Sequence, residues 1–200
     1  MSQNSPVLKE IKIVAIGAGN SGSNIINYMM NDKQSSVKFI ISNTHTYESL
    51  RETIGSADIV FVVAGFGGTT GFAHSIFVAR LAKVIGALTI GVVSTPFAFE
   101  GSDRFNLAEG GIEILKTVAD SVVVIPNDKL LSSMDDEWLF PKAFQFVDGI
   151  FERVINAISG AIRSSGDNPF NLVSKDLQTI LIDNGLAGLG IGEYEADTKS

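Results

Sequence analysis

Five short apolar runs constrain the fold of this chain more than any other feature of its sequence. Each run is continuous rather than alternating, and most are separated by segments with the spacing of a helix. Continuous apolar runs are typical of strands covered on both faces, as in a parallel sheet with helices on each side. The predicted fold class is therefore α/β, with a doubly wound, mostly parallel sheet. The predicted strands are residues 11–16, 37–42, 58–64, 88–93 and 121–125.

A long helix is predicted near the end of the chain, from Phe140 to Ile162. Its apolar residues recur at steps of three and four, which indicates one broad buried face. They are Ala143, Val147, Ile150, Val154, Ile158 and Ala161. Turn-forming residues at 164–169 end this helix. A short helix is predicted over 174–183, and the Gly-rich segment 185–192 is a candidate last strand.

Composition bounds the class of protein. The 200 residues are 45% hydrophobic and 18% charged, which predicts one globular domain, residues 10–192, between a flexible arm (1–9) and a polar tail (193–200). There is no cysteine, so disulfides and Cys-ligated metal sites are excluded. No signal peptide or membrane span is predicted, and we expect a cytoplasmic protein. A net charge of -7 argues against nucleic acid and anionic lipid as partners.

The first predicted strand runs into a G-x-G-x-x-G turn, Gly17 to Gly22, that opens a helix. Glycines let the backbone approach a phosphate, and a helix N-terminus supplies N–H donors and positive dipole. The alternative is a tight strand-to-helix turn without a ligand. A Rossmann NAD site should also carry an acid at the end of the second strand, to bind the ribose. That strand ends instead in Ser42-Asn43-Thr44, which lowers the NAD interpretation without excluding it.

A second Gly-rich loop, Gly65 to Gly71, lies between the third predicted strand and the next helix. Two such loops on one sheet are unusual for a Rossmann domain and suit folds in which each loop takes one part of a nucleotide polyphosphate. A glycine-packed turn with no ligand is the equally weighted alternative.

Three further segments resemble the cell-division GTPase FtsZ, of the tubulin/FtsZ family, in the same order and with nearly the same spacing. They are residues 87–93, the stretch Thr95 to Gly101, and the stretch Val124 to Leu131. Residues 11–24 and 185–192 also match, so the resemblance covers most of 10–192. It implies a GTPase-domain fold that binds GTP or GDP, with Mg²⁺ if GTP is bound.

The resemblance also implies roles for particular residues. Glu100 and Arg104 match the family's ribose and phosphate contacts, while Asn127 and Asp148 match the positions that contact guanine. A carboxylate can accept from guanine N1–H and from its exocyclic amine together, a pair that adenine lacks. For Glu100 and Arg104 the alternative is an exposed i,i+4 ion pair, and for Asp148 a solvated helix position. The implied phosphate-loop residues are Gly17, Gly19, Asn20, Ser21, Gly22, Ser23, Asn24, Gly67, Gly68, Thr69, Thr70, Gly71, Phe72 and Ala73.

Departures from the family pattern lie on the phosphate side. Phe72 replaces a hydroxyl residue and either fills phosphate space or turns into the core, and His45 stands where the family has an Asp. Residues 50–57 lack the segment that in FtsZ closes over the terminal phosphate. The family's catalytic loop matches residues 171–176, in which Asp176 is the one tentative catalytic acid left. Losing such groups should reduce hydrolysis by orders of magnitude.

The sequence thus predicts a guanine-nucleotide-binding, FtsZ-like protein of the cytoskeletal, cell-division type with weak or lost hydrolysis. If it is an enzyme at all, it is a GTPase acting at a subunit interface. Its expected partner is a second copy or a full-length FtsZ-type protein, in a filament or dimer. The FtsZ C-terminal domain is expected to be absent. The alternatives are a non-catalytic interaction module with a vestigial pocket and, less favoured, an NAD-binding Rossmann protein.

Overall fold

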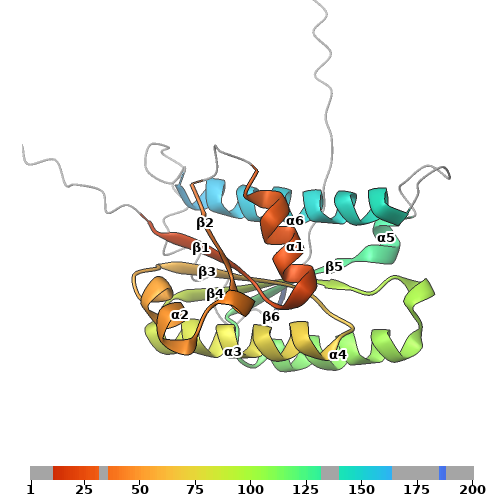
Figure 1. Ribbon diagram of the computed structural model, residues 1–200, viewed down its shortest axis with the longest axis horizontal. Helices are drawn as coiled ribbons and strands as arrows, with labels where there is room; N and C mark the ends of the chain where they lie inside the picture. The colour runs from red at the N-terminus through yellow and green to blue at the C-terminus, as the bar shows by residue number, and fades with distance from the viewer. Residues whose placement is uncertain (1–10, 32–35, 132–139, 164–184, 188–200) are drawn as a thin grey trace, which may run out of the picture.

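The computed structural model describes residues 11–31, 36–131, 140–163 and 185–187, which form a layered α/β structure (Figure 1). Its six strands form one parallel sheet in the order β2-β1-β3-β4-β5-β6. The strands are β1 (Ile13–Gly17), β2 (Lys38–Ile41), β3 (Ile59–Gly65), β4 (Leu88–Thr95), β5 (Ser121–Pro126) and β6 (Gly185–Ala187). The predicted fold class is confirmed, and the five predicted strands match β1 to β5 within two residues at each end.

Helices cover both faces of the sheet. Helices α1 and α6 lie on one face, and α2, α3 and α4 lie on the other (Figure 1). The helices are α1 (Gly19–Met29), α2 (Tyr47–Ile54), α3 (Thr69–Ile85), α4 (Ser102–Lys116), α5 (Asn127–Leu131) and α6 (Phe140–Arg163). Two short 3-10 turns, η1 (Ser42–Thr44) and η2 (Ala98–Glu100), follow the ends of β2 and β4. The strands are therefore covered as their continuous apolar sequences require.

Alternate residues of each strand enter two separate hydrophobic cores. Ile13 and Ala15 of β1 pack with α1 and α6, whereas Val14 and Ile16 pack with α2, α3 and α4. The same alternation along the other strands gives the sheet two apolar faces. Burial of the central sheet on both sides makes it a rigid support for the loops at its edges.

Helix α6 matches the predicted long helix and ends one residue beyond it, at Arg163. Its predicted buried face is confirmed over Ala143, Val147, Ile150 and Val154, and Ile158 is partly buried. The prediction was wrong for Ala161, which is exposed. A row of residues seven apart drifts around a straight helix by roughly 20° per step, so the row through Val147 and Val154 reaches the edge of the buried face at Ala161. Phe151, Ile155 and Ile162 are buried in its place.

Several predicted segments lie partly or wholly outside the described residues. The candidate last strand, 185–192, is described only over β6, which pairs with β5. The predicted helix at 174–183, the arm at 1–9 and the tail at 193–200 are outside the described ranges. Within those ranges, no helix has the length and apolar character needed to cross a membrane.

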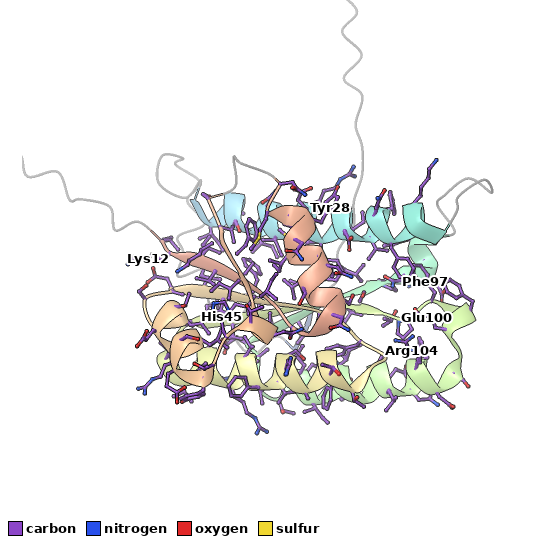
Figure 2. The ribbon with its side chains drawn as sticks, in the orientation of Figure 1. Lys12, Tyr28, His45, Phe97, Glu100 and Arg104 are labelled. Carbon is purple, nitrogen blue, oxygen red and sulfur yellow. The ribbon has the colours of Figure 1, made fainter. Side chains whose placement is uncertain are left out.

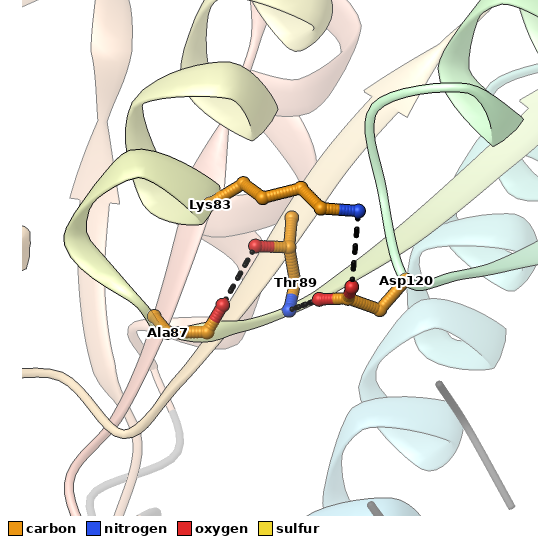
Figure 3. Close-up of polar contacts among 4 residues, drawn as sticks. All are labelled: Lys83, Ala87, Thr89 and Asp120. Atoms are coloured by element: carbon orange, nitrogen blue, oxygen red, sulfur yellow. Dashed lines mark hydrogen bonds and ion pairs between the residues drawn. The ribbon is translucent and has the colours of Figure 1, made fainter. Parts of the chain in front are cut away.

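A polar junction ties α3 to the amino ends of β4 and β5, at the edge opposite the strands' carboxyl ends (Figure 3). Asp120 Oδ2 accepts from the backbone N–H of Thr89 (2.8 Å), and Asp120 N–H donates to the Thr89 carbonyl (2.9 Å). The second carboxylate oxygen, Oδ1, lies 3.3 Å from Lys83 Nζ. Thr89 is fully buried, so its N–H has no solvent to replace the carboxylate.

Replacing Asp120 with alanine should lower the free energy of unfolding by about 1–3 kcal/mol, because the Thr89 N–H is left buried and unpaired. Lys83→Ala is the matched control: it removes only the half-exposed cation of the same junction and should change stability by about 0.5 kcal/mol or less. Urea denaturation of both variants measures the difference. Equal losses in the two variants would show that the ion pair, and not the backbone bond, stabilises the junction.

Candidate functional site

The candidate site lies at the carboxyl ends of β1 and β3, where the strand order reverses. The chain moves from β1 to β2 on one side and then returns across β1 to β3. In open α/β sheets, ligands bind in the crevice at such a reversal. The two Gly-rich turns follow these two strands, at Gly17 and Gly65, and lead into α1 and α3. The strand order therefore brings together loops that are far apart in the sequence.

The two turns are in contact through glycine backbones. Gly19 has a φ of 71°, and a Cβ at this position would lie 2.5 Å from Gly71 Cα. A side chain is thus excluded at Gly19 both by its conformation and by the neighbouring turn. The first turns of α1 and α3 therefore meet with only backbone between them.

Neither helix start is capped by a side chain. Ala18 precedes α1 and Gly68 precedes α3, and neither gives a side-chain cap hydrogen bond. The first turn of each helix also lacks an acidic residue. The N–H groups and positive dipoles of two helices consequently converge with no carboxylate to neutralise them. This arrangement suits a group with several negative oxygens, such as a polyphosphate.

Side chains of the predicted phosphate loops are mostly directed outward. Ser23 is half-buried, and its Oγ donates to the Gly19 carbonyl (2.7 Å). Among the side-chain hydrogen bonds of the described residues in these turns, those that occur involve Ser23. The exposed residues are Asn20, Ser21, Asn24, Thr69, Thr70 and Ala73. Contacts to a ligand in these turns would therefore come chiefly from backbone N–H groups.

The Phe72 ring turns into the core and does not fill the space between the two helix starts. Its centroid lies 6.1 Å from that of Phe66 in an edge-to-face arrangement, and the ring packs against Gly111 of α4. Of the two interpretations open at Phe72, the structure therefore supports the core. The hydroxyl that Phe72 replaces is missing, but its backbone N–H keeps its place in the first turns of α3.

Glu100 and Arg104 lie next to each other and form an ion pair (Figure 2). Arg104 Nη1 lies 2.7 Å from Glu100 Oε2, and Glu100 Oε1 accepts from the Phe97 N–H at 2.9 Å. Arg104 Nε also donates to the Gly67 carbonyl (3.1 Å). The pair is thus more than the exposed i,i+4 pair of the alternative interpretation, because it fixes the turn at Gly67 to the start of α4. The guanidinium is thus held beside the α3 N-terminus, with its charge balanced by Glu100.

Two polar side chains with unmet hydrogen-bonding capacity lie on α5 and α6. Asn127, the first residue of α5, is 5% exposed, and its buried Oδ1 has no hydrogen-bond partner in the described part of the chain. Asp148 on α6 is half-buried, and desolvation raises its pKa from 3.8 to about 6. No hydrogen bond or ion pair to the Asp148 carboxylate occurs among the described residues. A carboxylate in such surroundings favours a ligand that donates hydrogen bonds.

Two features of this region were not predicted. Phe144 lies one turn before Asp148, is 48% exposed and meets Phe97 edge-to-face with centroids 5.4 Å apart. Its i,i+4 spacing from Asp148 was the available signal for an aromatic surface next to the acid. The second feature is a hydrogen-bonded chain at the phosphate side: His74 Nδ1 lies 2.8 Å from Asn43 Oδ1, and Asn43 Nδ2 donates to Ser23 Oγ (3.4 Å).

The ring nitrogen Nδ1 of His45 is engaged within its own segment and not with the two glycine turns. That atom lies 2.9 Å from the Ile41 carbonyl and 3.0 Å from Thr44 Oγ1, and the residue is exposed. It is an exposed residue of the segment after η1. Asp176, the tentative catalytic acid, lies outside the described residues.

Comparisons with known proteins agree with this fold. A sequence model described as "Tubulin/FtsZ family, GTPase domain" matches residues 42–135. An empty FtsZ dimer from M. jannaschii superposes with a TM-score of 0.77 at 26% identity, over 88% of this chain and 62% of that one. An FtsZ point mutant from M. jannaschii gives 0.76 at 27%, over 94% and 67%. GDP-bound CetZ1 from Haloferax volcanii gives 0.66 at 15%, over 88% and 66%, and shares the fold.

The parallel sheet, with a glycine turn after β1 and another after β3, defines an α/β domain with the fold of the tubulin/FtsZ GTPase domain. Within that class, the chain is FtsZ-like: it resembles the tubulin/FtsZ GTPase domain in sequence and in structure. It spans 62% of the length of the first FtsZ structure and 67% of the second.

Proposed function

We propose that this chain binds a guanine nucleotide, GDP or GTP, at the carboxyl ends of β1 and β3. The observation that carries the proposal is the contact of two uncapped helix starts at Gly19 and Gly71. Backbone N–H groups there would bind the phosphates, and Arg104 would add a cation beside them. The GDP-bound state of CetZ1 and the GTPγS-bound state of CetZ2, both from Haloferax volcanii, are consistent with such a ligand on this fold.

Guanine is the base that the other end of the site fits best. Asp148 needs a ligand that donates two hydrogen bonds, and guanine N1–H and N2–H offer them. The buried Asn127 Oδ1 would gain a partner in the same ligand, and the exposed Phe144 ring would stack on a purine. Magnesium would be held through phosphate oxygens, because the described residues contain no group of three acids or histidines that could hold it alone.

Calorimetry with GDP, GTP, ATP and NAD tests the proposal directly. Guanine nucleotides should bind, and ATP and NAD should bind far more weakly. Identification of any nucleotide released on denaturing the purified protein is an independent measurement. Failure of both guanine nucleotides to bind at high micromolar concentration would overturn the proposal.

Weak or lost hydrolysis is the second part of the proposal. It is motivated by the sequence at 171–176, where Val173 and Lys175 precede Asp176, and by the short connection from α2 to β3 at residues 55–58. Water positioning and charge stabilisation supply most of the catalysis of phosphoryl transfer. If Asp176 still acts between subunits, phosphate release should rise with protein concentration and be lost in Asp176→Ala. Equally slow phosphate release by the wild type and by Asp176→Ala would show that Asp176 has no catalytic role.

As a third part of the proposal, this chain associates in the cytoplasm with a second copy of itself or with a full-length FtsZ-type protein. Solved structures on the same fold include an FtsZ dimer and protofilaments of CetZ2 and TubZ. Sedimentation with GTP, with and without a full-length FtsZ, measures it. A monomer at all concentrations and with both nucleotides would contradict it.

One observation favours the alternative of a non-catalytic interaction module with a vestigial pocket. Glu100 and Arg104 already satisfy each other and the neighbouring backbone, so neither side chain requires a ligand. That alternative expects a melting temperature that no nucleotide changes. The NAD alternative is weakened further, since β2 leads into Ser42–Thr44 of η1 with no acid at the strand end.

A further inference from the structure

A chain of three side chains joins the elements around the phosphate end of the candidate site. His74 of α3, Asn43 of η1 and Ser23 of α1 are linked in series, and Ser23 Oγ ends the chain on the Gly19 carbonyl. Ser42 Oγ additionally donates to the Gly17 carbonyl (2.8 Å), which holds η1 against the first turn. These contacts fix Asn43, and through it the imidazole, relative to both helix starts.

The direction of the hydrogen bonds determines which nitrogen of His74 carries a proton. Ser23 Oγ donates its one proton to Gly19, so it must accept from the Asn43 amide nitrogen, Nδ2. The amide oxygen, Oδ1, then faces His74, and Nδ1 of the imidazole must be the donor. In the neutral ring Nε2 is consequently an acceptor, and it becomes a donor only when the ring is charged.

The position of His74 places this ring beside the two helix starts. His74 follows Gly71 by three residues, so both lie on the same side of α3, and helical side chains lean toward the N-terminus of their helix. Gly71 is the residue whose backbone meets Gly19. The elements around this point offer little other positive charge: α1 contains no Lys or Arg, and Arg104 is engaged with Glu100 and Gly67.

We propose that His74, as an imidazolium oriented by Asn43, donates from Nε2 to the terminal phosphate of the bound nucleotide. The inference rests on the proposed function. It assigns to the phosphate end of the site a side-chain cation that would bind the phosphate directly, without a metal ion between them. The buried, unpartnered Oδ1 of Asn127, beyond the carboxyl end of β5, is a separate sign that this edge of the sheet takes a ligand.

The elements packed around His74 carry few charged side chains. From α1, no ionisable side chain faces this position, since Tyr28 lies two turns further along the helix. The segment after η1 contributes His45, whose Nδ1 is held at the Ile41 carbonyl. Helix α2 carries Glu48, Arg51 and Glu52, and α4 contributes Arg104. On α3 itself the next charged residue is Arg80, nearly two turns away.

The test compares GDP binding by the wild-type chain and by His74→Gln at about pH 6 and about pH 8, without added metal. The glutamine amide can still donate to Asn43, but it cannot take a charge. His45→Gln is the matched control, because it changes the only other histidine. Guanosine, which lacks phosphates, is the matched ligand. Comparing variants at the same pH cancels the titrations of the nucleotide and of Asp148.

We expect His74→Gln to weaken GDP binding about tenfold at the lower pH and by less than about twofold at the higher pH. His45→Gln should match the wild type at both pH values, and guanosine should bind equally to all three proteins. A variant that binds GDP as the wild type does at both pH values overturns the inference and leaves the proposed function intact. A wild-type chain that binds no guanine nucleotide overturns both.

Discussion

Alanine in place of Gly22 should lower the melting temperature of the domain by about 6–12 °C, through a loss of roughly 3 kcal/mol in the free energy of unfolding. A Cβ at this position would lie 2.3 Å from the Val63 carbonyl oxygen, a backbone atom of the central sheet. The same oxygen accepts a 2.8 Å hydrogen bond from the Ala18 N–H, just before α1. Helix α1 would have to move away from β3 and weaken the bond that fixes the first glycine turn.

Gly110→Ala is the matched control for this substitution. Gly110 is inside α4, and a Cβ there would meet nothing within 4 Å. Alanine should therefore stabilise the helix by about 0.5–1 kcal/mol. Thermal and urea denaturation measure both variants. An unchanged urea midpoint for Gly22→Ala would show that α1 can shift without cost, and that the close packing of this helix on the sheet does not hold the turn in place.

The fold could be predicted from the sequence because its main signal is local. A strand buried on both faces is apolar at most positions. Strand β3 is apolar throughout, and β4 is buried throughout although it contains Thr89, Ser94 and Thr95. The first glycine turn was also predictable, because a G-x-G-x-x-G pattern between a strand and a helix is typical of a tight turn. The one wrong position on α6, Ala161, comes from extending a seven-residue spacing through a helix of 3.6 residues per turn.

The hydrogen-bonded chain from His74 to Ser23 could not be predicted in this way. Its members lie on α1, η1 and α3, and they meet only because β1 lies between β2 and β3 in the sheet. Sequence periodicity predicts that strands exist, but it does not give their order. The resemblance to FtsZ did not help at this point, because it directed attention to His45, whose ring lies against the Ile41 carbonyl.

The pair Glu100 and Arg104 shows a different limit. Their i,i+4 spacing predicted that they could meet on a helix, and they do. The spacing could not predict that Arg104 also reaches Gly67, because this contact depends on how α4 packs beside the second turn. A loop-anchoring role for Arg104 therefore became apparent only with the structure.

Replacing Asp148 with asparagine should make the protein more stable near neutral pH and should nearly abolish its preference for guanine. Burial raises the pKa of Asp148 to about 6, so the folded state holds this proton more tightly than the unfolded chain, whose value is 3.8. The group therefore destabilises the fold above about pH 6, and this penalty disappears as the pH falls toward 4. After allowance for the exposed part of the side chain, Asp148→Asn should gain about 1 kcal/mol near pH 7.5 and nothing near pH 4.

The same change should weaken GDP binding about a hundredfold near pH 7.5. Asparagine can accept one hydrogen bond from guanine N1–H, but its amide nitrogen then faces the exocyclic amine as a second donor. Wild-type affinity should itself fall as the pH drops through about 6, because protonation converts one carboxylate oxygen into a donor. Binding of inosine diphosphate, which lacks the exocyclic amine, should lose much less in the variant than binding of GDP.

Glu113→Gln provides the control for the loss of one negative charge. Glu113 is on the exposed side of α4, 71% accessible and paired with Lys116, so its removal should change stability by about 0.5 kcal/mol or less and leave GDP binding unchanged. A variant Asp148→Asn that is stabilised but binds GDP normally would place Asp148 outside the site. One that loses GDP binding and is also destabilised would show that the carboxylate has a structural partner. The expected combination, higher stability with lost binding, arises only if the acid is kept at a cost to the fold because it binds the base.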